Sequence, residues 1–175
     1  MKKMLITALA CLPLSVIAAS NNTIQFQGEV TEQTCSVTVN GAEANPTVLL
    51  PTVTASALDQ AAKVAGMTRF TISLTGCSAP TGSDRAVGMV FVANNLTENG
   101  RIGNTGTAKN VTLQLVDPAS PGSALDLTGT TAAPGLVLAQ GATTASHDFA
   151  VQYYAEAAAQ AGSVLGSVQY AVTYQ

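Results

Sequence analysis

Tryptophan is absent from this chain of 175 residues, and histidine occurs once, at His147. Without a tryptophan, the Cys, Trp and Cys pattern of antibody domains is excluded. With one histidine and three cysteines, the sequence indicates neither a Ser-His-Asp arrangement nor a cluster of metal ligands. We therefore expect no enzyme, no metal and no cofactor. His147 stands at the start of an expected strand, where we interpret it as a surface or turn residue.

Charged residues are also scarce, at 10% of the chain, whereas hydrophobic residues make up 47%. Once Lys2 and Lys3 at the amino terminus are set aside, five basic residues face ten acidic ones, a net charge of −5. Nucleic acid is not an expected partner, because phosphates are neutralised by clustered Lys and Arg. The composition fits a subunit packed against copies of itself, although small residues are abundant in ordinary β domains too.

The amino terminus has the order of a secretory signal peptide. Lys2 and Lys3 provide a charged start, residues 4–10 are apolar, and small residues follow at 16–20. We assign residues 1–19 to the signal. The apolar run is too short for a membrane span. Cleavage is expected after Ala18 or Ala19, with Ser20 as a further alternative.

Two cysteines, Cys35 and Cys77, follow this leader. An even number of cysteines in an exported protein predicts a disulfide bond, and two buried thiols are the alternative. The third cysteine, Cys11, lies within the leader and raises the alternative of lipid attachment. Leu9 stands one place too near Cys11 for the usual lipoprotein pattern, so we do not favour lipidation.

The remaining 155 or so residues have a size suited to one domain. Phe70, Ile72 and Leu74 alternate with polar residues, and residues 86–93 form a continuous apolar run, as in a strand buried on both faces. Such patterns predict short strands separated by turns. The expected strands are 34–39, 47–50, 68–77, 86–93, 111–115, 149–154 and 162–175.

Turn residues separate these strands, as at 103–106 and 118–122. Several strands at this spacing indicate an all-β sandwich of immunoglobulin type. Residues 56–65 predict a short helix, and residues 155–161 are interpreted as the turn into the last strand. The stretch rich in Gly, Ala and Thr over residues 129–146 has no assigned course.

Both ends of the mature chain carry an alternating strand. Ile24, Phe26, Gly28 and Val30 share one face, because successive strand residues point to opposite sides. The strand at the amino terminus is spare, and the last strand is expected to lack a neighbour. Together they suggest head-to-tail assembly of subunits into a fibre. An ordinary first strand with a glycine bulge is the alternative. One face of the last strand is formed by Val164, Gly166, Val168, Tyr170, Val172 and Tyr174.

With these ends the chain resembles the type 1-like fimbrial major subunits, the pilins assembled by a periplasmic chaperone and an outer-membrane usher. Such pilins typically carry a penultimate tyrosine and a glycine fourteen residues from the end, here Tyr174 and Gly162. The order and spacing of the matching pieces make the resemblance specific. Those pieces are residues 24–30 followed by Cys35, the pair Gly76-Cys77, and residues 168–175.

The resemblance implies an incomplete immunoglobulin-like sandwich that lacks its last strand and is completed by a donor strand from a neighbouring subunit. Residues 20–32 would be the donor-strand extension and residues 33–175 the pilin domain. Ile24, Phe26 and Val30 would enter the groove of the neighbour, with Gly28 at its shallow part. The groove and chaperone-binding strand would comprise Gly162, Val164, Val168, Tyr170, Val172, Tyr174 and the terminal carboxylate of Gln175.

The implied function is that of a structural subunit of an adhesive fimbria on the bacterial cell surface, reached by export through the periplasm and assembled by donor-strand exchange. Implied partners are identical subunits, the chaperone, the usher, and a tip adhesin joined through adaptor subunits. A minor or adaptor pilin is one alternative. A secreted monomeric carbohydrate-binding sandwich is another, but it predicts an exposed aromatic platform, and only 5% of the chain is aromatic.

Overall fold

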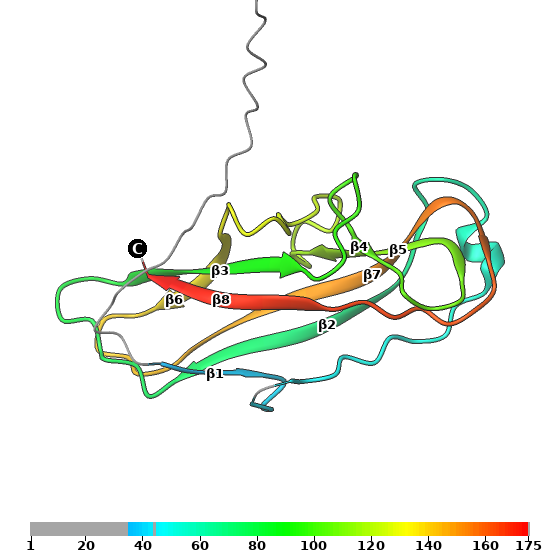
Figure 1. Ribbon diagram of the computed structural model, residues 1–175. Helices are drawn as coiled ribbons and strands as arrows, with labels where there is room; N and C mark the ends of the chain where they lie inside the picture. Colours follow the sequence, from blue (N-terminus) through cyan, green and yellow to red (C-terminus); the bar gives the residue numbers. More distant parts are fainter. Residues whose placement is uncertain (1–34, 44, 175) are drawn as a thin grey trace, which may run out of the picture.

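The computed structural model describes residues 35–43 and 45–174, which form a sandwich of two antiparallel sheets (Figure 1). One sheet has five strands in the order β1-β2-β7-β5-β4, and the other has three in the order β6-β3-β8. The predicted all-β class is confirmed. The strands are β1 Ser36–Val39, β2 Val64–Thr75, β3 Arg85–Ala93, β4 Ile102–Gly103, β5 Lys109–Val116, β6 Ala133–Leu138, β7 Ala145–Gln160 and β8 Val168–Tyr174.

The core lies between the two sheets, where the apolar residues of the facing strands meet. Ile72 of β2, Met89 and Phe91 of β3, and Phe149 of β7 are all buried. The rings of Phe91 and Phe149 meet edge to face, with 5.3 Å between their centroids. This arrangement is a preferred one for aromatic pairs, so the contact fastens one sheet to the other.

Strand β7 is longer than predicted and lies in the middle of the five-stranded sheet. It pairs with β2 from Ala145 to Tyr154 and with β5 from Ala150 to Gln160. The predicted turn over 155–161 is therefore wrong, because residues 155–160 continue the strand. Ala155 is fully buried in this part of β7.

Two further expectations are corrected. The helix expected over 56–65 is reduced to a single 3₁₀ turn at Ala55–Leu58, and Val64 and Ala65 already belong to β2. Residues 47–50 form no regular strand. The unassigned stretch 129–146 contains β6 and the start of β7.

The last strand begins later than predicted. Gly162 and Val164 lie in the connection between β7 and β8 rather than in a strand. Within β8 the side chains alternate as expected, since Gln169 and Ala171 are exposed. Four partly buried residues pack against the core, namely Val168, Tyr170, Val172 and Tyr174.

His147 lies in a strand rather than a turn, and its partly exposed side chain also packs against the core, so the expected surface role describes it only in part. It lies within β7, and its ring stands edge-on against Phe149, with 4.8 Å between the ring centroids. Gly135 of β6 leaves the space that the imidazole occupies, because a Cβ there would collide with the ring. His147 therefore helps to fill the sandwich near one end of the core.

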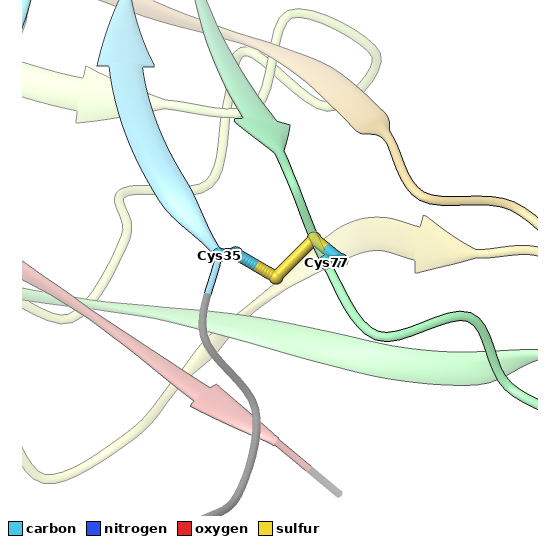
Figure 2. The surroundings of a disulfide bond; sticks show 2 residues. All are labelled: Cys35 and Cys77. Atoms are coloured by element: carbon cyan, nitrogen blue, oxygen red, sulfur yellow. A yellow bond between two sulfur atoms is a disulfide. The ribbon is translucent and has the colours of Figure 1, made fainter.

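Cys35 and Cys77 form a disulfide bond (Figure 2). The bond joins the residue before β1 to a residue shortly after the end of β2, across 42 positions of the sequence. On the chain-entropy model, a loop of this length stabilises the fold by about 4 kcal/mol. The disulfide therefore fixes β1 at the edge of the five-stranded sheet.

Candidate functional site

In the part of the chain that the structure describes, strand β8 has a paired strand on one side only. It pairs with β3 from Val168 opposite Ala93 to Tyr174 opposite Val87. Along its other side, no strand of the described part of the chain is paired with it. Such an edge presents main-chain N–H and C=O groups that can pair with another chain.

A second unpaired stretch of main chain runs over residues 45–53. Within the described residues, no main-chain hydrogen bond links it to a neighbouring strand. Its side chains nevertheless alternate as in a strand, because Val48 and Leu50 pack against the core while Leu49 is 83% exposed. Residues 47–50 thus have the pattern of a strand without the partner that would make them one.

A groove of about 920 Å³ lies between these two stretches, with residues 45–50 along one wall and 166–170 along the other. None of the described residues that line it is charged, and its polar side chains include Asn45, Asn94 and Gln169. The floor is made of core residues from both sheets, so the groove opens directly onto the hydrophobic core. These residues are Phe70, Ile72, Phe91, Ile102, Leu113, Leu115 and Val151.

A smaller hollow of about 340 Å³ lies between the continuations of the same two stretches, residues 52–55 and 161–164. Tyr153 lines this hollow, and its hydroxyl donates a hydrogen bond to the carbonyl oxygen of Pro51 at 3.2 Å. The hollow is lined further by Leu58 and Val111. The two depressions therefore follow one another along a single path between residues 45–55 and residues 161–170.

The sequence of this chain matches a known protein family. The model of that family, described as fimbrial protein, matches residues 24–175. The chain belongs to the fimbrial protein family. It is 38% identical over 174 residues to the F17 fimbrial protein of Escherichia coli, covering 95% of this chain and 94% of that protein.

This fimbrial protein is also 35% identical over 176 residues to the major fimbrial subunit SMF-1 of Stenotrophomonas maltophilia strain K279a, covering 95% of this chain and 99% of that protein. Among solved structures, it resembles the P pilus rod subunit PapA with a TM-score of 0.58 and 14% identity, over 80% of this chain and 99% of that one. At such low identity, the structural likeness concerns the fold. The fold is the sandwich of a pilin.

The sequence-predicted residues of the two chain ends fall into four groups. Val168 and Tyr170 line the groove, whereas Gly162 and Val164 line the smaller hollow. Val172 and Tyr174 pack against the core and do not belong to the groove lining. The expected donor residues Ile24, Phe26, Gly28 and Val30, and the expected chaperone ligand Gln175, lie outside the described residues.

Two glycines of the connection have steric reasons for being glycine. A Cβ at Gly162 would collide with the backbone of Ala108, so the loop between β4 and β5 approaches closely only because no side chain intervenes. A Cβ at Gly166 would lie 2.7 Å from Cγ2 of Ile102 and 3.0 Å from Cδ1 of Leu113, both of which line the groove. Gly166 therefore keeps this end of the groove deep.

Sequence reasoning missed the polar residues at one end of the groove. The Nδ2 of Asn94 donates to Oγ of Ser167 at 2.8 Å, and the Nε2 of Gln169 donates to Oδ1 of Asn94 at 2.9 Å. These bonds hold the start of β8 against the end of β3. Hydrophobic periodicity along the sequence cannot predict these contacts, because they join side chains more than 70 positions apart.

The acidic and basic side chains that the structure describes take no part in the groove of this fimbrial protein. The carboxyl of Asp126, whose pKa lies well below its usual range, is in the loop between β5 and β6. The main cause is hydrogen bonding from the backbone and hydroxyl of Thr128, with further bonds from Thr130 and Thr131.

Across residues 35–43 and 45–174, no three His, Cys, Asp or Glu side chains are grouped to hold a metal ion. The groove is suited to binding an apolar strand.

Proposed function

We propose that this protein is the structural subunit of an adhesive surface fimbria and polymerises head-to-tail by donor-strand exchange. Residues 20–32 of one subunit would fill the groove in the domain of the next, which spans residues 33–175. The observation that carries the proposal is the groove, whose described lining is uncharged and which opens to the core between the free edge of β8 and residues 45–53, which have no described strand partner. A further strand would complete both the sheet and the core.

The physical gain from such a strand has two parts. Its main chain can hydrogen-bond to the free edge of β8, and its alternate side chains can fill the apolar floor. Burial of Ile24, Phe26 and Val30 is worth about 1.5–3 kcal/mol each. Gly28 would lie where the groove is shallow, because glycine permits close approach of the backbone.

The proposed route runs through the periplasm. Residues 1–19 direct export, the disulfide forms in that oxidising compartment, and a periplasmic chaperone occupies the groove with a strand of its own. The chaperone would bind the terminal carboxylate of Gln175 as well as β8. An outer-membrane usher then replaces the chaperone strand with the extension of the next subunit, and adaptor subunits connect the fibre to a tip adhesin.

The favoured role is that of the major subunit, which the similarity to the major fimbrial subunit SMF-1 supports. A minor or adaptor pilin would use the same groove and the same extension. The abundance of the protein in purified fibres distinguishes the two roles. A major subunit makes up most of the fibre mass, and an adaptor only a small part.

The proposal is tested by supplying the missing strand within the same chain. The mature protein is expressed in a periplasm that lacks any fimbrial chaperone, with or without a copy of residues 21–31 fused by a flexible linker after Gln175. A matched control carries the same fusion with Ile24, Phe26 and Val30 of the copy replaced by Ser. We expect only the unaltered fusion to accumulate as a stable, disulfide-bonded monomer.

Equal stability of all three proteins would contradict the proposal. The fold would then be complete without a donor, and a secreted monomeric binding sandwich would be the better account. Equal stabilisation by the two fusions would show that the apolar side chains do not fill the groove.

A further inference from the structure

The connection between β7 and β8, residues 161–167, lies against the loop between β4 and β5, residues 104–108. The main-chain N–H of Thr105 donates to the carbonyl of Leu165 at 2.9 Å, and that of Ala108 donates to the carbonyl of Ser163 at 3.0 Å. The absence of a side chain at Gly106 and at Gly162 permits this approach, since a Cβ at either would collide with the opposite backbone.

Asn104 is the side chain that holds these two segments together. Its Oδ1 accepts hydrogen bonds from the main-chain N–H groups of Gly106 at 2.7 Å and Leu165 at 2.9 Å. Its Nδ2 donates to the carbonyl oxygens of Ala108 at 3.0 Å and Ser163 at 3.4 Å. A carboxamide offers two donors and two acceptor positions. Both donors and both acceptor positions of the Asn104 carboxamide are therefore used in hydrogen bonds to the two loops.

The held connection forms part of both depressions. Residues 161–164 line the smaller hollow, and residues 166–170 line the groove and lead directly into β8. Asn104 itself follows β4, whose Ile102 lies in the groove floor. Asn104 thus connects the floor of the groove to the wall that ends in the free edge of β8.

We propose that Asn104 is a positioning residue for strand capture, an inference that rests on the proposed function. It keeps the connection in the shape that presents the first residues of β8 to an incoming strand. If the connection before β8 were mobile, it would have to be ordered during binding, and the entropy cost of this ordering would lower the affinity. Loss of the Asn104 side chain is expected to weaken donor binding about tenfold, mainly through faster dissociation.

The test uses the refolded mature chain and a synthetic peptide of residues 21–31. Association and dissociation rates are measured for the wild type, Asn104→Ala and Thr107→Val. The last substitution removes the hydroxyl that accepts from the N–H of Ser163 at 2.9 Å, while keeping the size of the side chain. Thr71→Val is the matched control, because it removes a 2.7 Å bond to Asp148 between β2 and β7, away from the groove.

Amide hydrogen exchange at Thr105 and Ala108, whose main-chain acceptors remain in every variant, supplies a second measurement. In Asn104→Ala these amides are expected to exchange faster in the free chain and to slow again when the peptide is bound. Thr107→Val is expected to weaken binding in the same direction by a smaller factor, and it decides the question if Asn104→Ala does not fold. Thr71→Val is expected to leave the peptide rates unchanged.

Wild-type peptide rates in Asn104→Ala would overturn the inference and leave the proposed function standing. Equal weakening in Thr71→Val would also overturn it, because a general loss of stability would then explain the effect. If the wild type itself fails to bind the peptide, the proposed function fails first.

Discussion

Strands β7 and β8 carry similar alternating apolar residues but stand in opposite surroundings. β7 lies between β2 and β5, pairs with β2 from Ala145 to Tyr154 and with β5 from Ala150 to Gln160, and so has a partner on both sides where the two registers overlap. β8 has seven residues and, among the strands that the structure describes, pairs only with β3. The inward residues of β7, such as Phe149, are buried, whereas those of β8, such as Tyr170, are only partly covered.

The difference shows that, within the described residues, the sandwich is closed around β7 and open beside β8. The open place is specific, because the facing stretch over residues 45–53 also lacks a strand partner among the described residues. Two neighbouring elements are therefore unsatisfied along the same groove. A single added strand would satisfy both.

The largest effect is expected from Phe149→Ala, because it removes a ring at the centre of the closed part around β7. Loss of a buried phenylalanine costs about 3–5 kcal/mol of folding free energy. This cost should be the same in the mature chain and in the chain fused to its donor copy. Urea unfolding of both forms, each purified and refolded in vitro, measures it.

The matched substitution in the open part beside the groove is Tyr170→Ala. Its cost in the mature chain should be under about 1 kcal/mol, and it should rise to about 2 kcal/mol in the fused chain, where the donor covers the ring. A cost as large as that of Phe149→Ala in the mature chain would mean that β8 is as closed as β7.

Replacement of both Cys35 and Cys77 by Ser is expected to destabilise the mature chain by about 2–4 kcal/mol, since the unfolded chain gains conformational freedom. The bond holds β1 at the edge of the closed sheet. Reduction of the wild type with a thiol should produce the same shift of the urea midpoint. An unchanged urea midpoint in both experiments would show that the disulfide does not stabilise β1 at the edge of the sheet.

Gly162→Ala is expected to cost about 1–3 kcal/mol, because the added methyl group meets the backbone of Ala108 and must displace a loop. Gly82→Ala is the control, since a methyl group there would point into open space, with no atom beyond its chain neighbours within 4 Å. Thermal unfolding of the two variants gives the comparison. Equal melting temperatures would show that the loop yields without strain.

The smallest expected effect is a loss of folding stability in acidic solution. The pKa of Asp126 is lowered in the folded state, so its contribution to stability is complete above about pH 4 and declines as the solution is acidified. Asp126→Asn should therefore lose stability near neutral pH, and its difference from the wild type should shrink toward about pH 2. Unfolding free energies measured across this range test the prediction, with Asp59→Asn as the control, and a constant difference would contradict it.

The parts of the fold that were predictable are those whose partners lie within the chain. Apolar patterning located β2, β3, β5 and β8, because each places apolar residues on a core that exists in the folded domain. The second half of β7 was missed, since its alanine-rich sequence has no strand propensity of its own. Pairing with β5 overrides that local preference.

The candidate site was predictable only in part. The alternation of Val168 and Tyr170 placed them correctly on the inward face, but Ile102 and Leu113 could be assigned to the groove floor only after the sheets were known. Residues 47–50 have a strand pattern and no strand, because pattern reflects side-chain burial while a strand requires a main-chain partner. The contacts of Asn104 depend on loop geometry that no spacing encodes.

The absence of charge from the described lining of the groove has a consequence for the fibre as a material. Ionic strength acts on attractions between charged groups and barely touches apolar burial or main-chain pairing. Under the proposed assembly, each joint between subunits would hold equally well in fresh water, in urine or in sea water. Under this proposal, the strength of the fibre would not depend on the salt concentration around the cell.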